Sequence, residues 1–331
     1  MATDIRSLAW HEGGLRLLDQ TALPQRIVYL DITEVDALID AIRRLAVRGA
    51  PALGAAGAYG VAVALLQGER EGWDAARLAG EVKRIRDARP TAVNLAGGVD
   101  RVLPLVPAGV DAVLAEAAAV VREDVEANHA IGRNGADWIM SRVERRPLRV
   151  LTHCNTGSLA TAGWGTALGI IRELHARGVL ELVYVDETRP LLQGSRLTAW
   201  ELEQEGIVHL VQPDGAAAST ILRGLADVAV IGADRIAVNG DTANKIGSVG
   251  VALACADAGI PFVVAAPLTT FDDATAHGDD ITIEERPESE VLEWGGVRVA
   301  PAGSRAFNPA FDVTPVRLIS AIVNETGVRE Y

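Results

Sequence analysis

Cysteine is scarce in this sequence, where only Cys154 and Cys255 occur among 331 residues. Two cysteines are too few for a disulfide framework, and no C-x-x-C pair marks a structural zinc site. The six histidines are scattered along the chain, so we expect no histidine-based metal site. The composition is 49% hydrophobic and 23% charged, which is typical of a globular protein with a hydrophobic core.

Positively charged residues are also few. The sequence has 31 Lys and Arg against 44 Asp and Glu, which gives a net charge of −13. Nucleic-acid binding needs a local excess of Lys and Arg, so we expect no nucleic-acid partner. A small phosphorylated substrate needs only a few donors and stays compatible with this charge. Residues 1–14 lack an apolar signal core, and the longest apolar runs are broken by Gly, Arg or Pro. We therefore expect a soluble, cytoplasmic protein without a membrane partner.

Several familiar motifs are missing as well. The sequence has no G-x-x-x-x-G-K-[ST] phosphate loop, no G-x-S-x-G nucleophile elbow and no H-E-x-x-H metalloprotease motif. No predicted strand is followed by G-x-G-x-x-G. Asp186 and Glu187, which end a predicted strand, are therefore not favoured as ribose ligands of a dinucleotide.

Five short apolar runs alternate with helix-like segments in the second half of the chain. The runs are residues 148–154, 180–187, 206–211, 228–234 and 261–267. Buried strands that alternate with helices pair in parallel and carry helices on both faces, so this order predicts a Rossmann-like, doubly wound parallel sheet. Open sheets of this kind bind ligands at the carboxyl ends of their strands.

The first half has a different pattern. Residues 15–20 and 26–32 suit a small antiparallel sheet, and longer stretches have apolar residues at three- and four-residue intervals. These predicted helices cover residues 34–47, 53–68, 74–88 and 111–140. We therefore predict an α/β protein with a smaller, mainly helical N-terminal domain that includes a short antiparallel sheet, residues 1–130. The Rossmann-like domain would follow over residues 131–331.

Cys154 lies between the strand predicted over 148–154 and a segment that we expect to begin a helix. A thiol at a helix N-terminus feels the positive end of the helix dipole, which lowers its pKa and favours the thiolate. The alternative is a buried cysteine that packs as a small apolar residue, with Asn155 or Thr156 capping the helix. Packing is the commoner role of an isolated cysteine, and Cys255, in an apolar predicted helix, fits it.

Asp234 closes the apolar run over 228–234. A carboxyl group next to an apolar core has a raised pKa and can act as a general acid, although a turn or helix cap is the plainer alternative. Asn244 and Lys245 precede another expected helix start, where an amide and a cation could anchor a phosphate or a sugar hydroxyl. A solvated lysine is the alternative at that position.

Three further stretches offer polar groups to an anion or a sugar. Gln193 lies in a polar loop with Arg189 and Arg196, whose guanidinium groups could equally form internal ion pairs. Arg48-Gly49-Ala50 precedes a helix with spaced glycines, so backbone N–H groups and a guanidinium could converge on a phosphate. Those glycines could instead serve close helix packing. Arg89, before a proline, is another candidate anion contact, and the clusters together predict an enzyme for a small anionic, hydroxylated substrate.

Eight stretches, in this order, resemble the methylthioribose-1-phosphate isomerases, which share a family with the regulatory subunits of translation initiation factor 2B. They are RGAPALGAAGAYG (48–60), ARPTAVNL (88–95), LTHCNTGSLATAGWGTALG (151–169), DETRPLLQGSRLTAWEL (186–202), GADRIAVNGDTANKIGS (232–248), AAPLTT (265–270), IEER (283–286) and FNPAFDVTP (307–315). The resemblance runs from about residue 48 to the end of the chain, and the combination is far more specific than any one stretch.

This resemblance implies a small N-terminal domain, a Rossmann-like C-terminal domain and a homodimer. The implied activity is isomerisation of the aldose 5-methylthioribose 1-phosphate to the ketose 5-methylthioribulose 1-phosphate in methionine salvage, without a metal or another cofactor. The resemblance further implies that Cys154 and Asp234 are the catalytic pair. The residues that it implies for binding of the sugar phosphate substrate are Arg48, Gly49, Ala50, Arg89, Gln193, Asn244 and Lys245.

Alternatives to this activity stay open at the level of the sequence. Related isomerases act on 5-deoxyribose 1-phosphate or ribose 1,5-bisphosphate with the same catalytic pair and differ around C5 of the sugar. The chain could also be a non-catalytic regulatory subunit, which would have no chemical need for Cys154 together with Asp234. The route of hydrogen transfer, as a proton or as a hydride, is open too.

Overall fold

The computed structural model describes residues 6–90 and 93–331. Two parts of the sequence analysis fall outside these ranges. They are residues 1–5 of the stretch that lacks a signal core, and Thr91–Ala92 within the ARPTAVNL stretch.

Two units make up the fold. Unit 1 comprises the chain up to His129 together with Thr156–Leu168, and unit 2 comprises Ala130–Asn155 and Gly169–Tyr331. The chain thus leaves unit 2 directly after Asn155, next to the candidate catalytic cysteine. The division into domains 1–130 and 131–331 stays a proposal about which parts of the chain fold independently.

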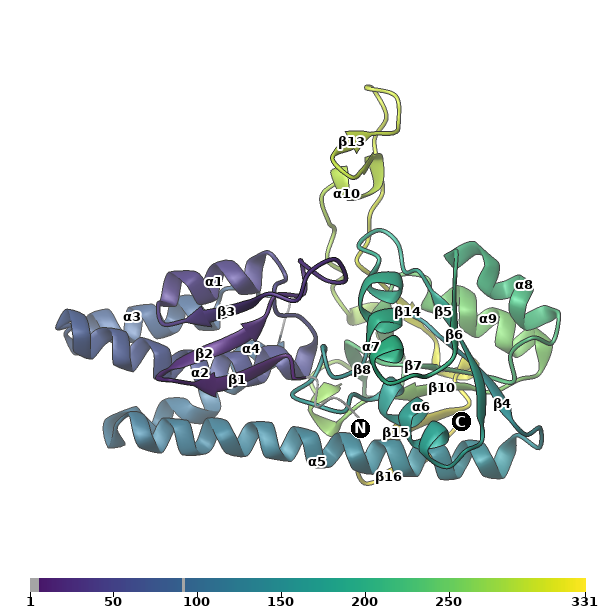
Figure 1. Cartoon of the computed structure of the whole chain (residues 1–331), viewed down its shortest axis with the longest axis horizontal. Helices are drawn as coiled ribbons and strands as arrows, with labels where there is room; N and C mark the ends of the chain where they lie inside the picture. Colours follow the sequence, from purple (N-terminus) through teal and green to yellow (C-terminus); the bar gives the residue numbers. More distant parts are fainter. Residues whose placement is uncertain (1–5, 91–92) are drawn as a thin grey trace. The chain divides into compact units, whose positions relative to one another are not determined.

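Unit 1 combines a three-stranded antiparallel sheet with helices (Figure 1). Its elements are β1 (Leu8–His11), β2 (Gly14–Leu18), β3 (Tyr29–Ile32), α1 (Val35–Arg43), α2 (Ala50–Glu71), α3 (Ala75–Arg86), α4 (Val93–Val102), a 3-10 helix (Leu103–Ala108) and the first part of α5 (Val110–Arg142). The small sheet and the four helices predicted for this half are confirmed. α4 was not predicted from the sequence.

The helix α2 has the length and composition of a membrane-spanning helix but is buried in unit 1. In its most apolar window, 83% of the residues lie inside the protein. An added Cβ on Gly57 would lie 2.6 Å from the carbonyl oxygen of Leu95 on α4, and one on Gly60 would meet Leu38 of α1. The spaced glycines of α2 therefore serve close helix packing, which was one of the two interpretations of the sequence.

The sheet of unit 2 has seven strands in the order β16-β15-β10-β7-β4-β5-β6 (Figure 1). All neighbours pair in parallel except β16, which runs antiparallel to β15. The sheet and its helices are β4 (Leu148–Thr152), α6 (Ala167–Ala176, which begins in unit 1), β5 (Leu180–Asp186), α7 (Ala199–Gln204), β6 (His209–Gln212), α8 (Ala217–Leu222), β7 (Val228–Ile231), α9 (Ser248–Ala258), β10 (Phe262–Ala265), β15 (Ala321–Asn324) and β16 (Gly327–Glu330). The predicted Rossmann-like sheet is confirmed, and each predicted strand is present with shorter bounds, except that β6 ends one residue later than predicted, at Gln212.

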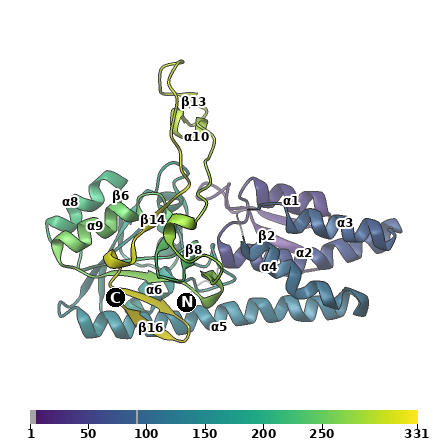
Figure 2. The same cartoon turned by 180° about the vertical axis from the view of Figure 1, so that it is seen from behind.

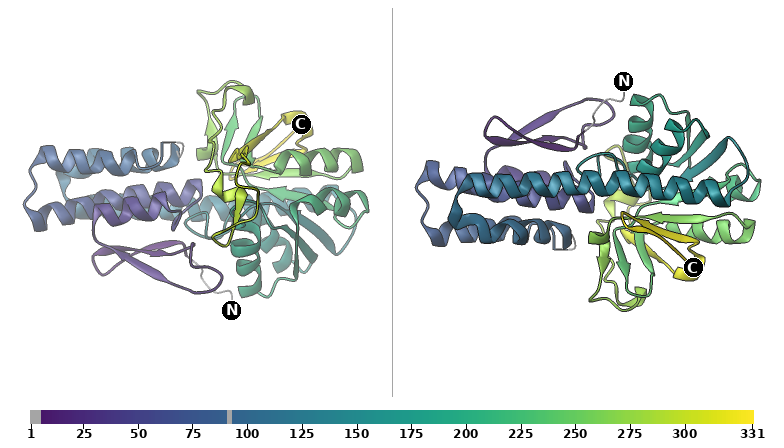
Figure 3. Two further views of the ribbon diagram at one scale, coloured as in Figure 1. Left: turned by 90° about the horizontal axis from the view of Figure 1, so that it is seen from above. Right: turned by 90° about the horizontal axis from the view of Figure 1, so that it is seen from below.

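The core of this sheet explains its uniformly apolar strands. Every residue of β7 and β10 is buried, because a parallel sheet is covered on both faces. The helices α8 and α9 pack over one face, where Ile231 and Phe262 share a cluster with Cys255. The part of α5 that belongs to unit 2 packs on α6, where a Cβ on Gly135 would lie 2.2 Å from Ile170, and it lies in front of the strands in the view from below (Figure 3). Because Cys255 is fully buried in the cluster with Ile231 and Phe262, the packing role expected for it is confirmed.

A second, four-stranded sheet in unit 2 was not predicted. Its order is β11-β8-β9-β14, with β8 (Arg235–Ala237), β9 (Thr242–Lys245), β11 (Phe271–Asp272) and β14 (Phe311–Thr314). β8 and β9 form a hairpin across Asn239-Gly240, in a stretch where the sequence indicated only a turn. Strands of two to four residues are too short to give a periodic pattern.

An arm of unit 2 extends away from both sheets (Figures 1 and 2). It carries α10 (Ser289–Leu292), β12 (Glu293–Trp294) and β13 (Val297–Arg298). Its apolar side chains are largely exposed, with Phe307 at 81%.

Candidate active site

The two candidate catalytic residues follow neighbouring strands of the parallel sheet. β4 pairs with β7 through Val150 and Val228, and Cys154 and Asp234 come two and three residues after these strands end. From β4 the sheet continues through β5 to β6, and from β7 it continues the other way through β10 to β15. The strand order therefore reverses between β4 and β7, and open α/β sheets bind their ligands at such a switch point.

The backbone of Cys154 has an unusual conformation that neighbouring side chains hold in place. Its φ is +65°, in the left-handed region that non-glycine residues rarely adopt. Thr188 accepts a hydrogen bond from the Cys154 amide over 2.9 Å, and Thr198 donates one to the Cys154 carbonyl over 2.7 Å. Strained backbone that its surroundings hold in this way is concentrated at functional sites. Cys154 is 4% exposed, so the loop conformation fixes a buried thiol.

The helix expected directly after Cys154 is absent, and this part of the sequence analysis was wrong. The next helix, α6, begins only at Ala167. Asn155 is not a cap, because its amide donates to Thr198 and Glu201 inside unit 2, while Thr156 belongs to unit 1. A helix dipole therefore does not act on the Cys154 thiol from this direction.

Gln193 lies in the segment that also supplies Thr188 and Thr198. This segment follows β5 and turns into a π-helical stretch, Gly194–Thr198. A Cβ at Gly194 would collide with the carbonyl oxygen of Asp186, which explains the glycine. Gln193 is 4% exposed, and its Oε1 atom has no hydrogen-bond partner among the described residues. A buried amide oxygen without a partner is costly, and a ligand hydroxyl could satisfy it.

Asp234 lies at the start of the β8–β9 hairpin. Its backbone N–H donates to Ala243 over 2.9 Å, which places it beside the strand that carries Asn244 and Lys245. Asp234 is exposed. The expectation that it lies against apolar core is therefore wrong, because Gly232 and Ala233 carry the chain beyond the buried strand β7.

Asn244 and Lys245 form the end of β9. The Asn244 amide is buried and donates to Ser248 over 2.9 Å. The Lys245 ammonium group donates to the carbonyl oxygen of Ala310 over 2.9 Å and lies 4.4 Å from the centre of the Phe311 ring. The predicted helix start after this pair is confirmed as α9.

The N-terminus of α9 already holds a carboxylate. Asp312 Oδ2 accepts hydrogen bonds from the backbone N–H groups of Gly247 and Val249 over 2.8 and 3.2 Å. Burial raises the pKa of Asp312, although these two hydrogen bonds act in the opposite direction. The carboxylate of Asp312 thus occupies the helix start at which the sequence analysis considered an anchor for an anion.

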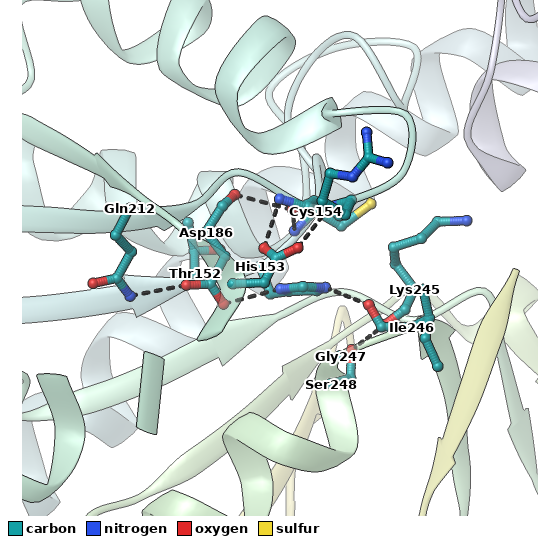
Figure 4. Close-up of polar contacts among 12 residues, drawn as sticks. Thr152, His153, Cys154, Asp186, Gln212, Lys245, Ile246, Gly247 and Ser248 are labelled. Atoms are coloured by element: carbon teal, nitrogen blue, oxygen red, sulfur yellow. Dashed lines mark hydrogen bonds and ion pairs between the residues drawn. The ribbon is translucent and has the colours of Figure 1, made fainter. Parts of the chain in front are cut away.

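A buried polar chain next to Cys154 was not found from the sequence. His153 is 1% exposed, and its Nδ1 atom lies 2.9 Å from Asp186 while its Nε2 atom lies 2.9 Å from the carbonyl oxygen of Ile246 (Figure 4). Gln212 donates to the second oxygen of Asp186 over 2.8 Å, and Thr220 donates to Gln212 over 2.7 Å. Asp186, which the sequence offered as a possible ribose ligand, is thus an internal partner of His153. The clue in the sequence was a histidine beside the cysteine.

Within the described ranges, one group brings metal-ligating atoms close together, namely His153, Asp186 and Asp214 within 4.8 Å of one another. Asp214 accepts the backbone N–H groups of Thr188 and Arg189 over 2.7 and 2.6 Å. Nε2 of His153 donates to the Ile246 carbonyl and Nδ1 shares a proton with Asp186, so both ring nitrogens are already engaged. We assign no metal to this group.

A second buried network lies on the other side of Cys154. The Asn155 amide donates to Glu201 over 2.7 Å, and Arg172 donates to Glu201 over 2.9 Å and to Glu205 over 2.6 Å. Arg172 and Glu201 are almost completely buried. The residues before and after Cys154 are therefore both anchored to buried charged groups.

The other predicted site residues belong to unit 1. Arg48 and Gly49 precede α2, and Ala50 is its first residue. Gly49 has a φ of +92°, and a Cβ there would collide with Ala160, so this position requires glycine. Arg89 follows the end of α3. The structure thus groups Cys154, Asp234, Gln193, Asn244 and Lys245 in unit 2, and Arg48, Gly49, Ala50 and Arg89 in unit 1.

Comparison with known proteins gives two curated relatives of high similarity. The chain is 52% identical to a probable bifunctional methylthioribose-1-phosphate isomerase/methylthioribulose-1-phosphate dehydratase of Nocardia farcinica, over 98% of this chain and 59% of the relative. It is 47% identical to a methylthioribose-1-phosphate isomerase of Desulforudis audaxviator, over 98% of this chain and 94% of the relative. The chain therefore spans little more than half of the bifunctional relative and nearly all of the second one.

Two solved structures have the same fold. The 5-methylthioribose 1-phosphate isomerase of Pyrococcus horikoshii matches with a TM-score of 0.87 and 37% identity, covering 98% of this chain and 92% of that one. A structure described as translation initiation factor 2B, subunit delta, from A. fulgidus matches with a TM-score of 0.86 and 41% identity, covering 98% and 96%. The model of the initiation factor 2 subunit family matches residues 46–330, which include every candidate site residue. This chain therefore belongs to the initiation factor 2 subunit family.

Proposed function

We propose that this protein is an aldose–ketose isomerase that converts 5-methylthioribose 1-phosphate to 5-methylthioribulose 1-phosphate. The observation that carries the proposal is the 47% identity to the Desulforudis isomerase over nearly the full length of both chains. The placement of Cys154 and Asp234 after adjacent strands at the switch point supports it.

The chemistry explains why an acid and a thiol would be needed together. The anomeric oxygen of the substrate is esterified to phosphate, so the sugar ring does not open to a free aldehyde by itself. We assign the first proton transfer to Asp234, which as a carboxylic acid would protonate the ring oxygen while the bond from this oxygen to C1 breaks. Because Asp234 is exposed, the bound substrate would have to displace water from it to keep the acid protonated.

The second step moves hydrogen from C2 to C1, and two routes conserve the atoms and charges of this step. In the proton route, the Cys154 thiolate removes the C2 proton to give an enol, and the thiol then returns this proton to C1 while the Asp234 carboxylate takes the proton of the C2 hydroxyl. In the hydride route, hydrogen moves from C2 to C1 with its electron pair while the Asp234 carboxylate takes the proton of the C2 hydroxyl. Cys154 would then polarise or shield the site. Both routes end with a C2 ketone and a C1 methylene that carries the phosphate.

We assign substrate binding to the remaining predicted residues. Lys245 supplies a cation beside the hairpin that carries Asp234, and the buried Oε1 of Gln193 can accept a hydroxyl hydrogen. Asn244 is a further contact for a sugar hydroxyl. The unit 1 residues proposed for substrate binding are Arg48, Gly49, Ala50 and Arg89.

The setting of the activity is also part of the proposal. We propose a homodimer that works in the cytoplasm in methionine salvage and needs no added metal or nucleotide, without a nucleic-acid or membrane partner. Light scattering of the purified protein should give twice the chain mass. A single chain mass in solution would contradict the dimer and leave the activity to be judged by its own assay.

The activity is tested by a side-by-side assay with three pentose 1-phosphates that carry a methylthio, a hydrogen or a phosphate group at C5. We expect turnover without an added cofactor and the highest kcat/KM for the methylthio substrate. A higher kcat/KM for the deoxy or the phosphorylated sugar would support the isomerase activity but assign it a different substrate. If folded protein turned over none of the three sugars, the proposed enzymatic activity would be wrong.

A second candidate function is a regulatory subunit, because the A. fulgidus structure with 41% identity is described as a factor 2B subunit. Such a subunit would bind a sugar phosphate and release it unchanged. The same assay separates the two functions, since binding measured by calorimetry without turnover would favour the subunit.

A further inference from the structure

His153 connects three segments at the edge of the parallel sheet. It comes directly before Cys154, its Nδ1 atom contacts Asp186 at the end of β5, and its Nε2 atom contacts the carbonyl oxygen of Ile246, the residue after Lys245. In Figure 4 the sulfur of Cys154 and the side chain of Lys245 lie on the same side of the His153 ring. The histidine thus links the loop of the candidate catalytic thiol to the loop of the candidate anion contact.

The partners of the ring define where its hydrogens are. A carbonyl oxygen can only accept, so Nε2 donates to Ile246. Gln212 donates to one oxygen of Asp186 because its own Oε1 atom accepts from Thr220, which leaves the other oxygen for Nδ1. His153 and Asp186 therefore share one further proton in a buried pair. The direction of the two outer hydrogen bonds, to Ile246 and from Gln212, is therefore the same wherever the shared proton lies.

The ring also fills the space above the backbone after Lys245. A Cβ on Gly247 would lie 2.8 Å from Cε1 of His153, so the imidazole packs directly against this glycine. Gly247 has a φ of +110° and donates its N–H to Asp312. The path of the chain from Lys245 into α9 is thus fixed by His153 on one side and by Asp312 on the other.

We propose that His153 is a positioning residue that holds Cys154 and Lys245 at a fixed separation, so that a substrate bound by Lys245 presents C1 and C2 to the site of hydrogen transfer. The inference rests on the proposed isomerase function. His153 itself does not touch the reacting atoms in this role. It acts through the two loops that its nitrogens and its ring hold together.

The expected effect of losing this link is on kcat more than on KM. Lys245 still binds the substrate when His153 is replaced, but the reacting carbons are then misplaced relative to Cys154 and Asp234. A misplacement of about 1 Å costs on the order of 100-fold in rate. His153→Leu should therefore lower kcat about 100-fold and change KM much less.

The conservative variant tests which contact matters. The amide nitrogen of His153→Gln can reach the position of Nε2 and donate to Ile246, so this variant should recover a substantial part of kcat. The matched control is His209→Leu. His209 is a half-buried histidine on β6 whose Nδ1 lies 2.9 Å from the carbonyl oxygen of Ile207. This control should leave kcat unchanged, because β6 is at the far edge of the sheet.

A double-mutant cycle with Lys245 separates positioning from general destabilisation. If His153 acts by fixing the distance to Lys245, His153→Leu should cost far less in a Lys245→Ala background than in the wild type. Independent effects would multiply. Lys83 is the only other lysine of the sequence and lies exposed on α3, so His153→Leu in a Lys83→Ala background should keep its full effect.

A readout without substrate keeps the inference separate from the proposed function. With Cys255 replaced by Ala throughout, the rate of Cys154 alkylation by iodoacetamide reports how firmly the buried thiol loop is held. We expect faster alkylation in His153→Leu and restoration toward the wild-type rate in His153→Gln. Folded His153→Leu protein with wild-type alkylation would overturn the positioning role, as would unchanged kcat or multiplicative effects with Lys245→Ala. If the wild-type protein shows no turnover, the proposed isomerase activity is wrong. The alkylation rates then decide by themselves whether His153 holds the loop of Cys154.

Discussion

The hydroxyl of Thr198 donates to the carbonyl oxygen of Cys154 over 2.7 Å, so a residue at the start of α7 holds the candidate catalytic loop. Thr188 holds the amide of the same residue from the end of β5. Both threonines are fully buried. The left-handed conformation of Cys154 is therefore maintained by two side chains from a segment that lies more than 30 residues further along the chain.

Removing the Thr198 hydroxyl should destabilise the protein and slow the reaction. Thr198→Val takes away the hydroxyl that donates to the buried Cys154 carbonyl, which costs about 1–3 kcal/mol. The strained loop then relaxes and kcat falls. Urea unfolding and steady-state kinetics measure the two effects. Thr198→Ser keeps the hydroxyl and should keep most of kcat; equal losses in the two variants would mean that the hydrogen bond does not maintain the loop.

Cys154→Ser and Asp234→Asn should each lower kcat by at least about 100-fold while the substrate still binds. Calorimetry with the substrate and steady-state kinetics give the two quantities. The control for the thiol is Cys255→Ala. Burial raises the pKa of Cys255 to about 12, so this residue of α9 stays a thiol in the core and should be dispensable for turnover. Near wild-type activity of Cys154→Ser would make this thiol structural.

Gln193→Leu should change substrate binding while leaving the free energy of unfolding nearly unchanged. Because Oε1 of Gln193 is buried without a partner among the described residues, replacing the amide by an apolar side chain of similar size removes a costly group. We expect a free energy of unfolding within about 1 kcal/mol of the wild type. KM should rise about 5-fold, because a neutral hydrogen bond to the substrate is worth on the order of 1 kcal/mol. An unchanged KM would remove Gln193 from the substrate-binding set.

Arg172→Met should be among the most destabilising substitutions near the site. It leaves Glu201, which is fully buried, without the guanidinium group that balances its charge. Breaking a buried ion pair from one side costs about 3–5 kcal/mol. Arg305→Met breaks the exposed pair with Glu288 and should change the free energy of unfolding little. Similar small effects from both variants would show that the buried network does not support the fold.

The stability of the protein should depend on pH through His153. Burial disfavours the charged imidazole, but the hydrogen bond and charge of Asp186, the charge of Asp214 and the Ile246 carbonyl together raise the pKa of His153 above its usual 6.5. Asp312 is a third carboxyl group facing the ring. The folded state thus binds the proton more tightly, and its stabilisation is complete below pH 6.5 and declines as the pH rises through the folded-state pKa.

Urea unfolding of the wild type and His153→Gln between about pH 6 and pH 9 measures this dependence. The difference in unfolding free energy between the two proteins should be largest at the acidic end and shrink toward the alkaline end. A difference that stays constant, or that grows with pH, would contradict a raised pKa of His153 in the folded protein. Burial also raises the pKa of Asp186 and Asp312, which makes stability decline with pH in the same direction, so the comparison with His153→Gln is needed to isolate the part that depends on the imidazole.

The outline of the fold was available from local patterns. Continuous apolar runs marked five strands of the parallel sheet, and three- and four-residue spacing marked α1, α2, α3 and α5. The short strands around Asp234 and Lys245 were not predicted, because three or four residues in a loop rich in Gly, Asn and Asp carry no periodicity. The expected helix after Cys154 failed for a related reason: the direction of the chain there is set by Thr188 and Thr198, which are distant in sequence.

The apolar pattern of the sequence was enough to show which residues follow the ends of parallel strands, and it placed Cys154 after one strand and Asp234 after another. That these two strands are neighbours at the switch point follows from the order of the sheet, which the pattern does not contain. Tertiary structure alone decided how these groups are held: the left-handed turn at Cys154, the exposure of Asp234, the carboxylate of Asp312 at the start of α9 and the contact of His153 with Ile246. Each depends on hydrogen bonds between residues far apart in the chain, and local propensity contains no information about such pairs.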